Sequence, residues 1–159
     1  MENPEPQLAV SLSAIDIERI LPHRFPFLFV DKITEFVPGR RIAAVKHFSV
    51  NDEVAGGNFP GLALIPTSVI LELVTQVGAV LVLERPDMAG KIAMILQIPS
   101  ARIIKPIEAG DTVRVEAEVL KMKAQFGELR GFVFRDGELV AEGQMRFGIA
   151  NAADVMPGR

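Results

Sequence analysis

Residues 67–83 read TSVILELVTQVGAVLVL, and this stretch decides the fold. Its apolar side chains recur at the three- and four-residue spacing of a helix and cover most of the helix circumference. Glu72, Thr75 and Gln76 interrupt the apolar run, which argues against a membrane span. A helix that is apolar nearly all round needs other elements around it. The sequence therefore predicts a buried helix from about Thr67 to Leu83.

The chain after residue 90 supplies strands that can wrap this helix. Between residues 113 and 119, valine and alanine alternate with charged side chains, as in a half-buried antiparallel strand. Asp136-Gly137 is a favoured two-residue hairpin turn, with apolar alternation on both sides. Residues 91–104 predict one further apolar strand or a pair of strands.

The chain before residue 60 predicts a short helix and two strands. Ser13 and Asp16 have the spacing of a helix cap, and Pro22 ends the helix that follows. The segment from residue 27 to 37 predicts a strand, and residues 41–50 predict a second one.

One apolar helix among strands that mostly follow it is typical of an α+β fold. We expect a curved antiparallel β-sheet wrapped around a long buried central helix. Residues 13–150 are expected to form the single domain, with a flexible lead-in at residues 1–12 and a flexible tail at residues 151–159.

Composition excludes several classes of function. The formal net charge of −3 gives no electrostatic attraction to nucleic acid or to an anionic membrane. The absence of cysteine rules out disulfides and thiolate chemistry. The first fourteen residues lack the basic and apolar regions of a signal peptide, so a cytoplasmic location is the default expectation.

Polar side chains form one stripe on the predicted central helix. Ser68, Glu72 and Gln76 recur every four residues, and Thr75 lies beside them. A carboxylate on such a helix must be paired, hydrated or protonated. The stripe predicts either a face that meets water at a groove or interface, or an acid or base in a cleft.

A loop rich in glycine and proline, Gly57-Asn58-Phe59-Pro60-Gly61, precedes the helix. Such a loop lets backbone approach a ligand closely. The helix start that follows offers unpaired N–H groups to a carbonyl oxygen. No spacing of residues indicates a metal site, and we expect no cofactor.

These motifs resemble a known family. Residues 57–76 are similar to the FabZ-type pattern G-H-F-P-G-x-P-x-M-P-G-x-x-x-x-E-x-x-x-Q. Residues 21–31, LPHRFPFLFVD, resemble the L-P-H-R-Y-P-F-L-L-V-D of the same family. Lys105-Pro106, Gly110-Asp111 and Asp136-Gly137 also match, so the resemblance to the 3-hydroxyacyl-acyl-carrier-protein dehydratases spans roughly residues 15–147.

The resemblance implies a hotdog fold, assembled as a homodimer or trimer of dimers, that acts on acyl chains carried by acyl carrier protein or coenzyme A in fatty-acid or related biosynthesis. It places the catalytic glutamate on Glu72 and the catalytic histidine on Asn58. It also places the glycine whose N–H polarises the thioester on Thr67. Substrate-binding roles are expected for Thr67, Gly61, Phe59 and Gln76.

Asn58 leaves the activity open, because an amide cannot accept and release a proton near neutral pH. We expect acyl-thioester binding and, if the chain is an active enzyme, weakened or altered dehydratase (hydro-lyase) activity. One alternative is a thioesterase that uses Glu72. Another is a non-catalytic carrier-binding subunit, or one that lends Glu72 to a histidine-bearing partner in a hetero-oligomer.

The remaining candidates have simpler interpretations. His23 and His47 are the only histidines, and His23 lies in the N-terminal family motif, where a structural role is favoured over that of a substitute base. Phenylalanines at residues 25, 27, 29 and 59 could line an acyl tunnel, although core packing is the commoner use. Arg40, Arg41, Lys46 and Arg102 are either contacts for an acidic carrier protein or ordinary surface charge.

Overall fold

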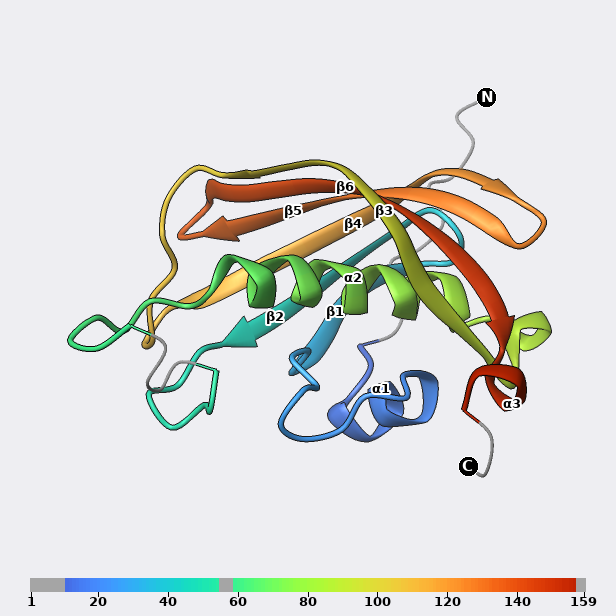
Figure 1. The fold of residues 1–159 in the computed structure, drawn as a ribbon, viewed down its shortest axis with the longest axis horizontal. Helices are drawn as coiled ribbons and strands as arrows, with labels where there is room; N and C mark the ends of the chain where they lie inside the picture. The colour runs from blue at the N-terminus through green and yellow to red at the C-terminus, as the bar shows by residue number, and fades with distance from the viewer. Residues whose placement is uncertain (1–10, 55–58, 157–159) are drawn as a thin grey trace.

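The computed structural model describes residues 11–54 and 59–156. Within them, six strands form one antiparallel sheet in the order β1-β2-β4-β5-β6-β3 (Figure 1). The central helix and the short 3₁₀ turn η1 (Pro86–Met88) connect β2 to β3, which lies at the opposite edge of the sheet from β1. The strands are β1 (Lys32–Val37), β2 (Arg41–His47), β3 (Lys91–Ile103), β4 (Thr112–Lys123), β5 (Phe126–Arg135) and β6 (Glu138–Asn151).

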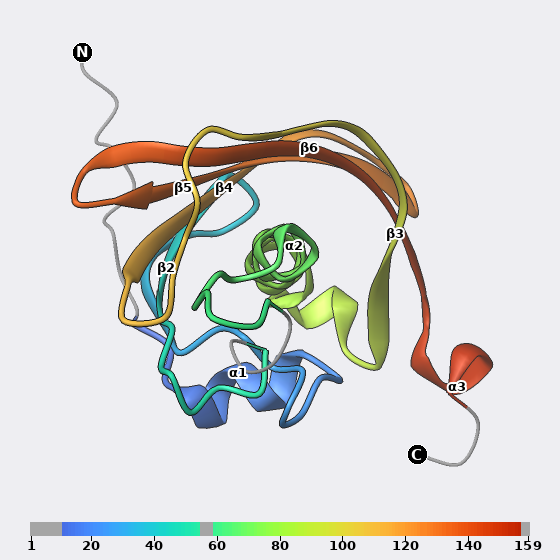
Figure 2. The same cartoon turned by 60° about the vertical axis from the view of Figure 1, so that its left-hand side comes forward.

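Helix α2 (Thr67–Leu83) lies in the concave face of this sheet. Figure 2, which looks nearly along the helix, shows the sheet arching over α2, with α1 on the opposite side. Leu73, Val77, Val80 and Leu81 of α2 are completely buried. The predicted α+β arrangement and the predicted helix are confirmed.

Glycines on the sheet and on α2 let the two approach closely. A Cβ atom added to Gly131 of β5 would lie 2.2 Å from Cγ1 of Val74. One added to Gly78 of the helix would lie 2.6 Å from Cδ2 of Leu129. Interiors packed at this density have no room for a larger side chain at either position.

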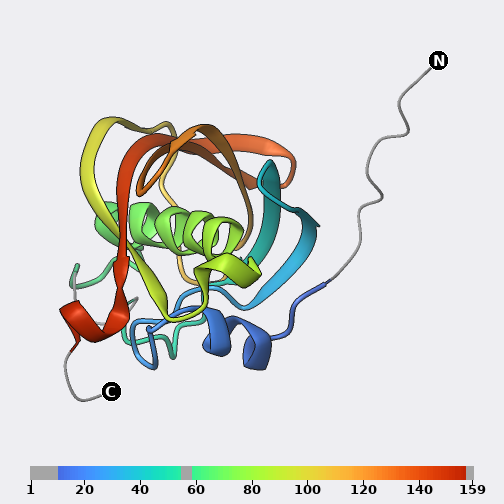
Figure 3. The same cartoon turned by 90° about the vertical axis from the view of Figure 1, so that its right-hand side faces the viewer.

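Helix α1 (Ala14–Ile20) forms with the predicted cap, because the Ser13 backbone N–H donates to the Asp16 carboxylate over 3.0 Å. Just before it, the backbone of Leu12 pairs with that of Ile33 on the outer side of β1. Figure 3 shows α1 packed below α2, on the side away from the sheet. The last element of the described residues is a one-turn helix, α3 (Ala152–Val155).

The Asp136-Gly137 hairpin is confirmed. It joins β5 to β6 with φ angles of 52° and 80°, as a turn with two left-handed residues requires. The prediction that the second strand reaches residue 50 is wrong: β2 ends at His47, because Ser49 and Asp52 close a turn through two 3.0 Å hydrogen bonds. None of the described helices is long and apolar enough to cross a membrane.

Candidate active site

Glu72 faces a cavity of about 290 Å³ that lies between α2 and β3. One end of the cavity is polar, and the remainder is formed by apolar side chains of α2 and of three strands. Such a cavity suits a ligand with a polar head and an apolar chain. The polar lining consists of His23, Glu72, Thr75 and Gln76, and the rest of Gly78, Ala79, Val82, Ala93, Met94, Ile95, Leu129 and Phe147.

The Glu72 carboxylate is held by neighbours on its own helix. Nε2 of Gln76, one turn further on, donates to Oε1 of Glu72 over 2.9 Å. The Thr75 hydroxyl lies 3.2 Å from Oε2 and 2.8 Å from the Glu72 carbonyl oxygen. The side chain keeps 26% of its surface exposed. The carboxylate is therefore oriented but still reachable from the cavity.

Gln76 ties the helix to the segment that precedes β1. The residue is 1% exposed, and its Oε1 accepts a 2.9 Å hydrogen bond from the backbone N–H of Phe29. Its Nε2 donates to the carbonyl oxygen of Phe27 over 2.8 Å. These bonds give the physical reason why the strand predicted from residue 27 begins only at Lys32: the amide of Gln76 takes the place of a neighbouring strand.

His23 lies beside Glu72, although 49 positions separate them in sequence. Its Nε2 is 3.5 Å from Oε1 of Glu72. The Arg24 guanidinium fixes the loop by donating to the carbonyl oxygens of Glu18, Leu21 and His23 over 2.6 to 2.9 Å. Sequence spacing could not reveal this contact, because it depends on how the loop after α1 folds back on α2.

The two nitrogen atoms of His23 have different surroundings. Nδ1 is buried and has no hydrogen-bond partner among the described residues, whereas Nε2 faces Glu72 and the cavity. Burial lowers the pKa of His23 below its usual value, the Glu72 carboxylate opposes this shift, and the Arg24 guanidinium adds to it. The neutral imidazole is thus favoured over the imidazolium.

The other predicted site residues lie before the helix and at its start. Thr67 is the first residue of α2, so its N–H has no acceptor within the helix. Five residues along a helix separate it from Glu72, a rise of about 7.5 Å. Phe59 is partly exposed in a turn closed by Leu62, and Gly61 has a φ of 81°. Asn58 lies outside the described residues.

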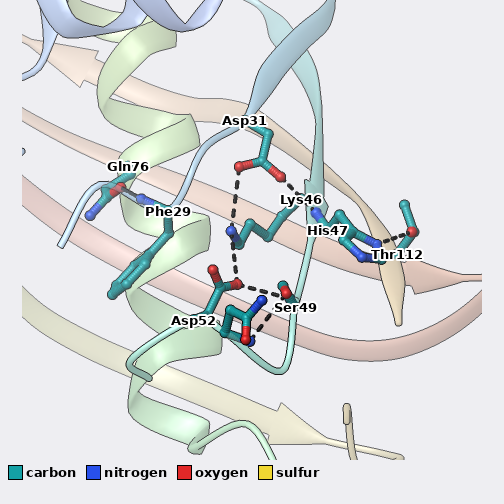
Figure 4. A network of polar contacts seen from close by, with 9 residues as sticks. Phe29, Asp31, Lys46, His47, Ser49, Asp52, Gln76 and Thr112 are labelled. Atoms are coloured by element: carbon teal, nitrogen blue, oxygen red, sulfur yellow. Dashed lines mark hydrogen bonds and ion pairs between the residues drawn. The ribbon is translucent and has the colours of Figure 1, made fainter. Parts of the chain in front are cut away.

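A buried lysine on β2 holds together the segment before β1 and the turn after β2. Nζ of Lys46 lies 3.3 Å from both Oδ1 of Asp31 and Oδ2 of Asp52 (Figure 4). Because Lys46 is 7% exposed, the prediction that it is a surface cation is wrong. Asp52 lies in the turn that leads toward Asn58, so Lys46 joins that turn to the segment bound by Gln76.

His47 has no part in the cavity lining. Its side chain is exposed, and Nδ1 lies 2.8 Å from the Thr112 hydroxyl (Figure 4). Of the two histidines, His23 alone contacts Glu72.

Comparison with known proteins identifies the family. A FabA-like domain matches residues 21–144. A 3-hydroxyacyl-acyl-carrier-protein dehydratase, FabZ, from Symbiobacterium thermophilum is 41% identical over 140 residues, which are 88% of this chain and 99% of that protein. The chain belongs to the FabZ-type 3-hydroxyacyl-acyl-carrier-protein dehydratase family. The motif resemblance of this FabZ-type chain to the family is thereby confirmed over most of the chain.

Solved structures confirm the hotdog fold of this FabZ-type chain. The dehydratase heterocomplex ApeI:P from Xenorhabdus doucetiae has a TM-score of 0.76 at 15% identity and covers 88% of this chain and 94% of its own. A hypothetical thioesterase with coenzyme A from Streptococcus pneumoniae has a TM-score of 0.58 at 14% identity, covering 75% and 84%. At these identities the likeness concerns the fold alone.

Proposed function

We propose that this chain binds acyl thioesters in the Glu72 cavity and dehydrates 3-hydroxyacyl thioesters to 2-enoyl thioesters, more slowly than relatives with histidine at position 58. One observation carries the proposal: an oriented, partly exposed carboxylate stands at the polar end of an apolar cavity. Family membership supports acyl chains on acyl carrier protein as the substrate class, and coenzyme A thioesters of the same acyl groups are the alternative.

The remaining site residues take complementary roles. The N–H of Thr67, free of helical partners, would donate to the thioester carbonyl oxygen and stabilise the negative charge that develops there. Gly61 and Phe59 would shape the entrance before the helix. Gln76 would act through Glu72, by fixing the orientation of its carboxylate.

Asn58 sets the expected rate. Its amide can orient a ligand but cannot carry a proton, and a general base contributes roughly 10²–10⁴-fold to such a step. We therefore infer a weak dehydratase whose proton transfer depends on Glu72.

Turnover of a 3-hydroxyacyl thioester, and hydration of the 2-enoyl product, test this proposal. The Glu72→Gln variant should lose about 100-fold or more of the rate, since it removes a proton-transferring group while keeping the shape. Glu138→Gln is the matched control, because Glu138 pairs with Lys105 at the surface. A wild-type protein without turnover, or a Glu72→Gln variant with full turnover, would contradict the proposal.

The same assay separates dehydration from thioester hydrolysis. A helix carboxylate near free helix N–H groups could also direct water onto the thioester carbonyl. Release of free thiol without formation of 2-enoyl thioester would identify a thioesterase and overturn the dehydratase proposal.

We also propose that two copies of the chain associate through β3. This strand lies at the edge of the sheet, pairs with β6 on one side, and exposes Ile95, Leu96 and Ile98. A histidine-bearing partner in place of the second copy is the alternative, and it would complete the site with the group that Asn58 lacks.

A further inference from the structure

We propose that His23 and Glu72 of the same chain form a proton-transferring pair that replaces the base absent at Asn58. This inference rests on the proposed dehydratase function and adds a second catalytic residue to it. The observation behind it is the juxtaposition of imidazole and carboxylate at the polar end of one cavity.

The geometry allows both groups to reach the same substrate. Nε2 of His23 and Oε1 of Glu72 are 3.5 Å apart, and both residues line the cavity. The His23 side chain is 28% exposed and that of Glu72 is 26% exposed. A separation slightly longer than a hydrogen bond is common for catalytic pairs without substrate, which tighten when the substrate binds.

The surroundings of His23 leave one ring nitrogen available for proton transfer. Nδ1 is buried and has no hydrogen-bond partner among the described residues. The ring lies tilted against that of Phe27, with 6.0 Å between the ring centroids. Nε2, which faces Glu72 and the cavity, is therefore the nitrogen through which the ring exchanges a proton.

The pair can carry out a balanced dehydration. The Glu72 carboxylate takes the proton from C2 of the 3-hydroxyacyl thioester, and the electron pair of that C–H bond forms the C2–C3 double bond. The C3–O bond breaks, and Nε2 of His23 gives its proton to the departing hydroxyl, which leaves as water. The proton on Glu72 then passes to Nε2 of His23 across 3.5 Å, which restores the starting state.

This scheme predicts a rate that rises as the pH falls. His23 must be protonated to act as the acid, and burial with the Arg24 guanidinium lowers its pKa, against the opposing effect of Glu72. Glu72 and Arg24 are the charged groups that act on the ring. Since the pKa lies below the ordinary 6.5, the protonated fraction is small at neutral pH and increases as the pH falls through that pKa.

The decisive experiment compares His23→Gln with His47→Gln, the corresponding change at the other histidine. His23→Gln should slow dehydration by about 100-fold and abolish the rise at acid pH. His47→Gln should keep both the rate and the pH profile. A His23→Gln variant with unchanged rate and profile would overturn the pair while the proposed function stands, whereas an inactive wild-type protein would overturn both.

A titration by NMR tests the pair independently of turnover and of how well His23→Gln folds. Two histidines give two imidazole signals, and the signal absent from His47→Gln identifies that of His47. In Glu72→Gln the pKa of His23 should fall, because the carboxylate that raises it is gone. A His23 pKa that is the same in both proteins would show that the two groups do not interact, and would refute the pair.

Discussion

On the proposed match to the FabZ-type motif, Asn58 stands at the position of the catalytic histidine. Replacing Asn58 with histidine supplies an imidazole to a site that already holds an oriented carboxylate. We expect the rate of dehydration to rise by roughly 10²–10⁴-fold, the usual contribution of a general base. The measurement is kcat for 2-enoyl thioester formation by Asn58→His and by the wild-type protein.

The size of that change also reports on Thr67. If Asn58→His brings no increase, the missing base is not the only cause of the slow rate. The Thr67 side chain, which is larger than the glycine of the family pattern, has then altered the position of the thioester. Thr67→Gly combined with Asn58→His should then recover the rate. Thr67→Gly alone should stay as slow as the wild-type protein.

Lys46 stabilises the fold as a buried cation between two carboxylates. In Lys46→Met the carboxylates of Asp31 and Asp52 lose their shared counter-charge, while the side chain keeps its length. The free energy of unfolding should fall by about 1–3 kcal/mol, measured by urea denaturation. Arg102→Met is the control, because the exposed Arg102–Glu142 pair contributes only about 0–1 kcal/mol. Equal losses in the two variants would contradict the assignment.

Sequence reasoning at the residue scale works when the signal is local. Glu72 could be predicted as a special residue, because a carboxylate stands out on an apolar helix. The contact of His23 with Glu72, and the burial of Lys46, could not be predicted. Both depend on segments that are distant in sequence and are brought together by Gln76 and by the Asp31 and Asp52 carboxylates.

Gln76 is the residue through which two elements, α2 and the segment before β1, are joined. In Gln76→Met the buried N–H of Phe29 and the carbonyl of Phe27 lose their partner, and Glu72 loses a donor. An unsatisfied buried polar group costs about 1–3 kcal/mol, so unfolding in urea should begin at clearly lower concentration.

Gln144→Met makes the same change at a position where the amide donates, among the described residues, only to Glu128. Its effect on the urea midpoint should be much smaller. Because the joined segment also holds His23, the Gln76 variant should in addition lose dehydratase activity. Unaltered stability in Gln76→Met would show that the backbone of Phe27 and Phe29 finds other partners.

At the scale of elements, the predictions that succeeded had strong periodicity or specific turn chemistry. Helix α2 was evident from its apolar pattern, and the turn at Asp136-Gly137 from its dipeptide. The predicted start of the first strand at residue 27 was wrong, because alternating phenylalanines are compatible both with a strand and with an extended segment outside the sheet. Here the Gln76 side chain, and not a neighbouring strand, supplies the hydrogen bonds of that segment. The β4–β5 turn was not predicted, since Ala124, with a φ of 51°, is not a typical turn residue.

The two edges of the sheet differ across the whole molecule. Leu12 pairs with Ile33 at the β1 edge and covers part of it. The β3 edge has no such cover among the described residues, and it carries exposed apolar side chains. Open apolar strand edges are unfavourable in water and commonly pair with another chain. The asymmetry therefore supports the proposed association through β3.

Association through β3 predicts a specific sensitivity to charge. Ile98→Glu places a carboxylate on this edge, where two copies would bring like charges together, so the dimer should dissociate to monomers. Leu120→Glu on β4 is the matched control. Leu120 is 44% exposed and Ile98 is 43% exposed, but β4 is not an edge strand. Sedimentation equilibrium measures both. A monomeric wild-type protein would contradict the proposed association. An Ile98→Glu variant that remains dimeric while Leu120→Glu dissociates would place the contact on another part of the sheet.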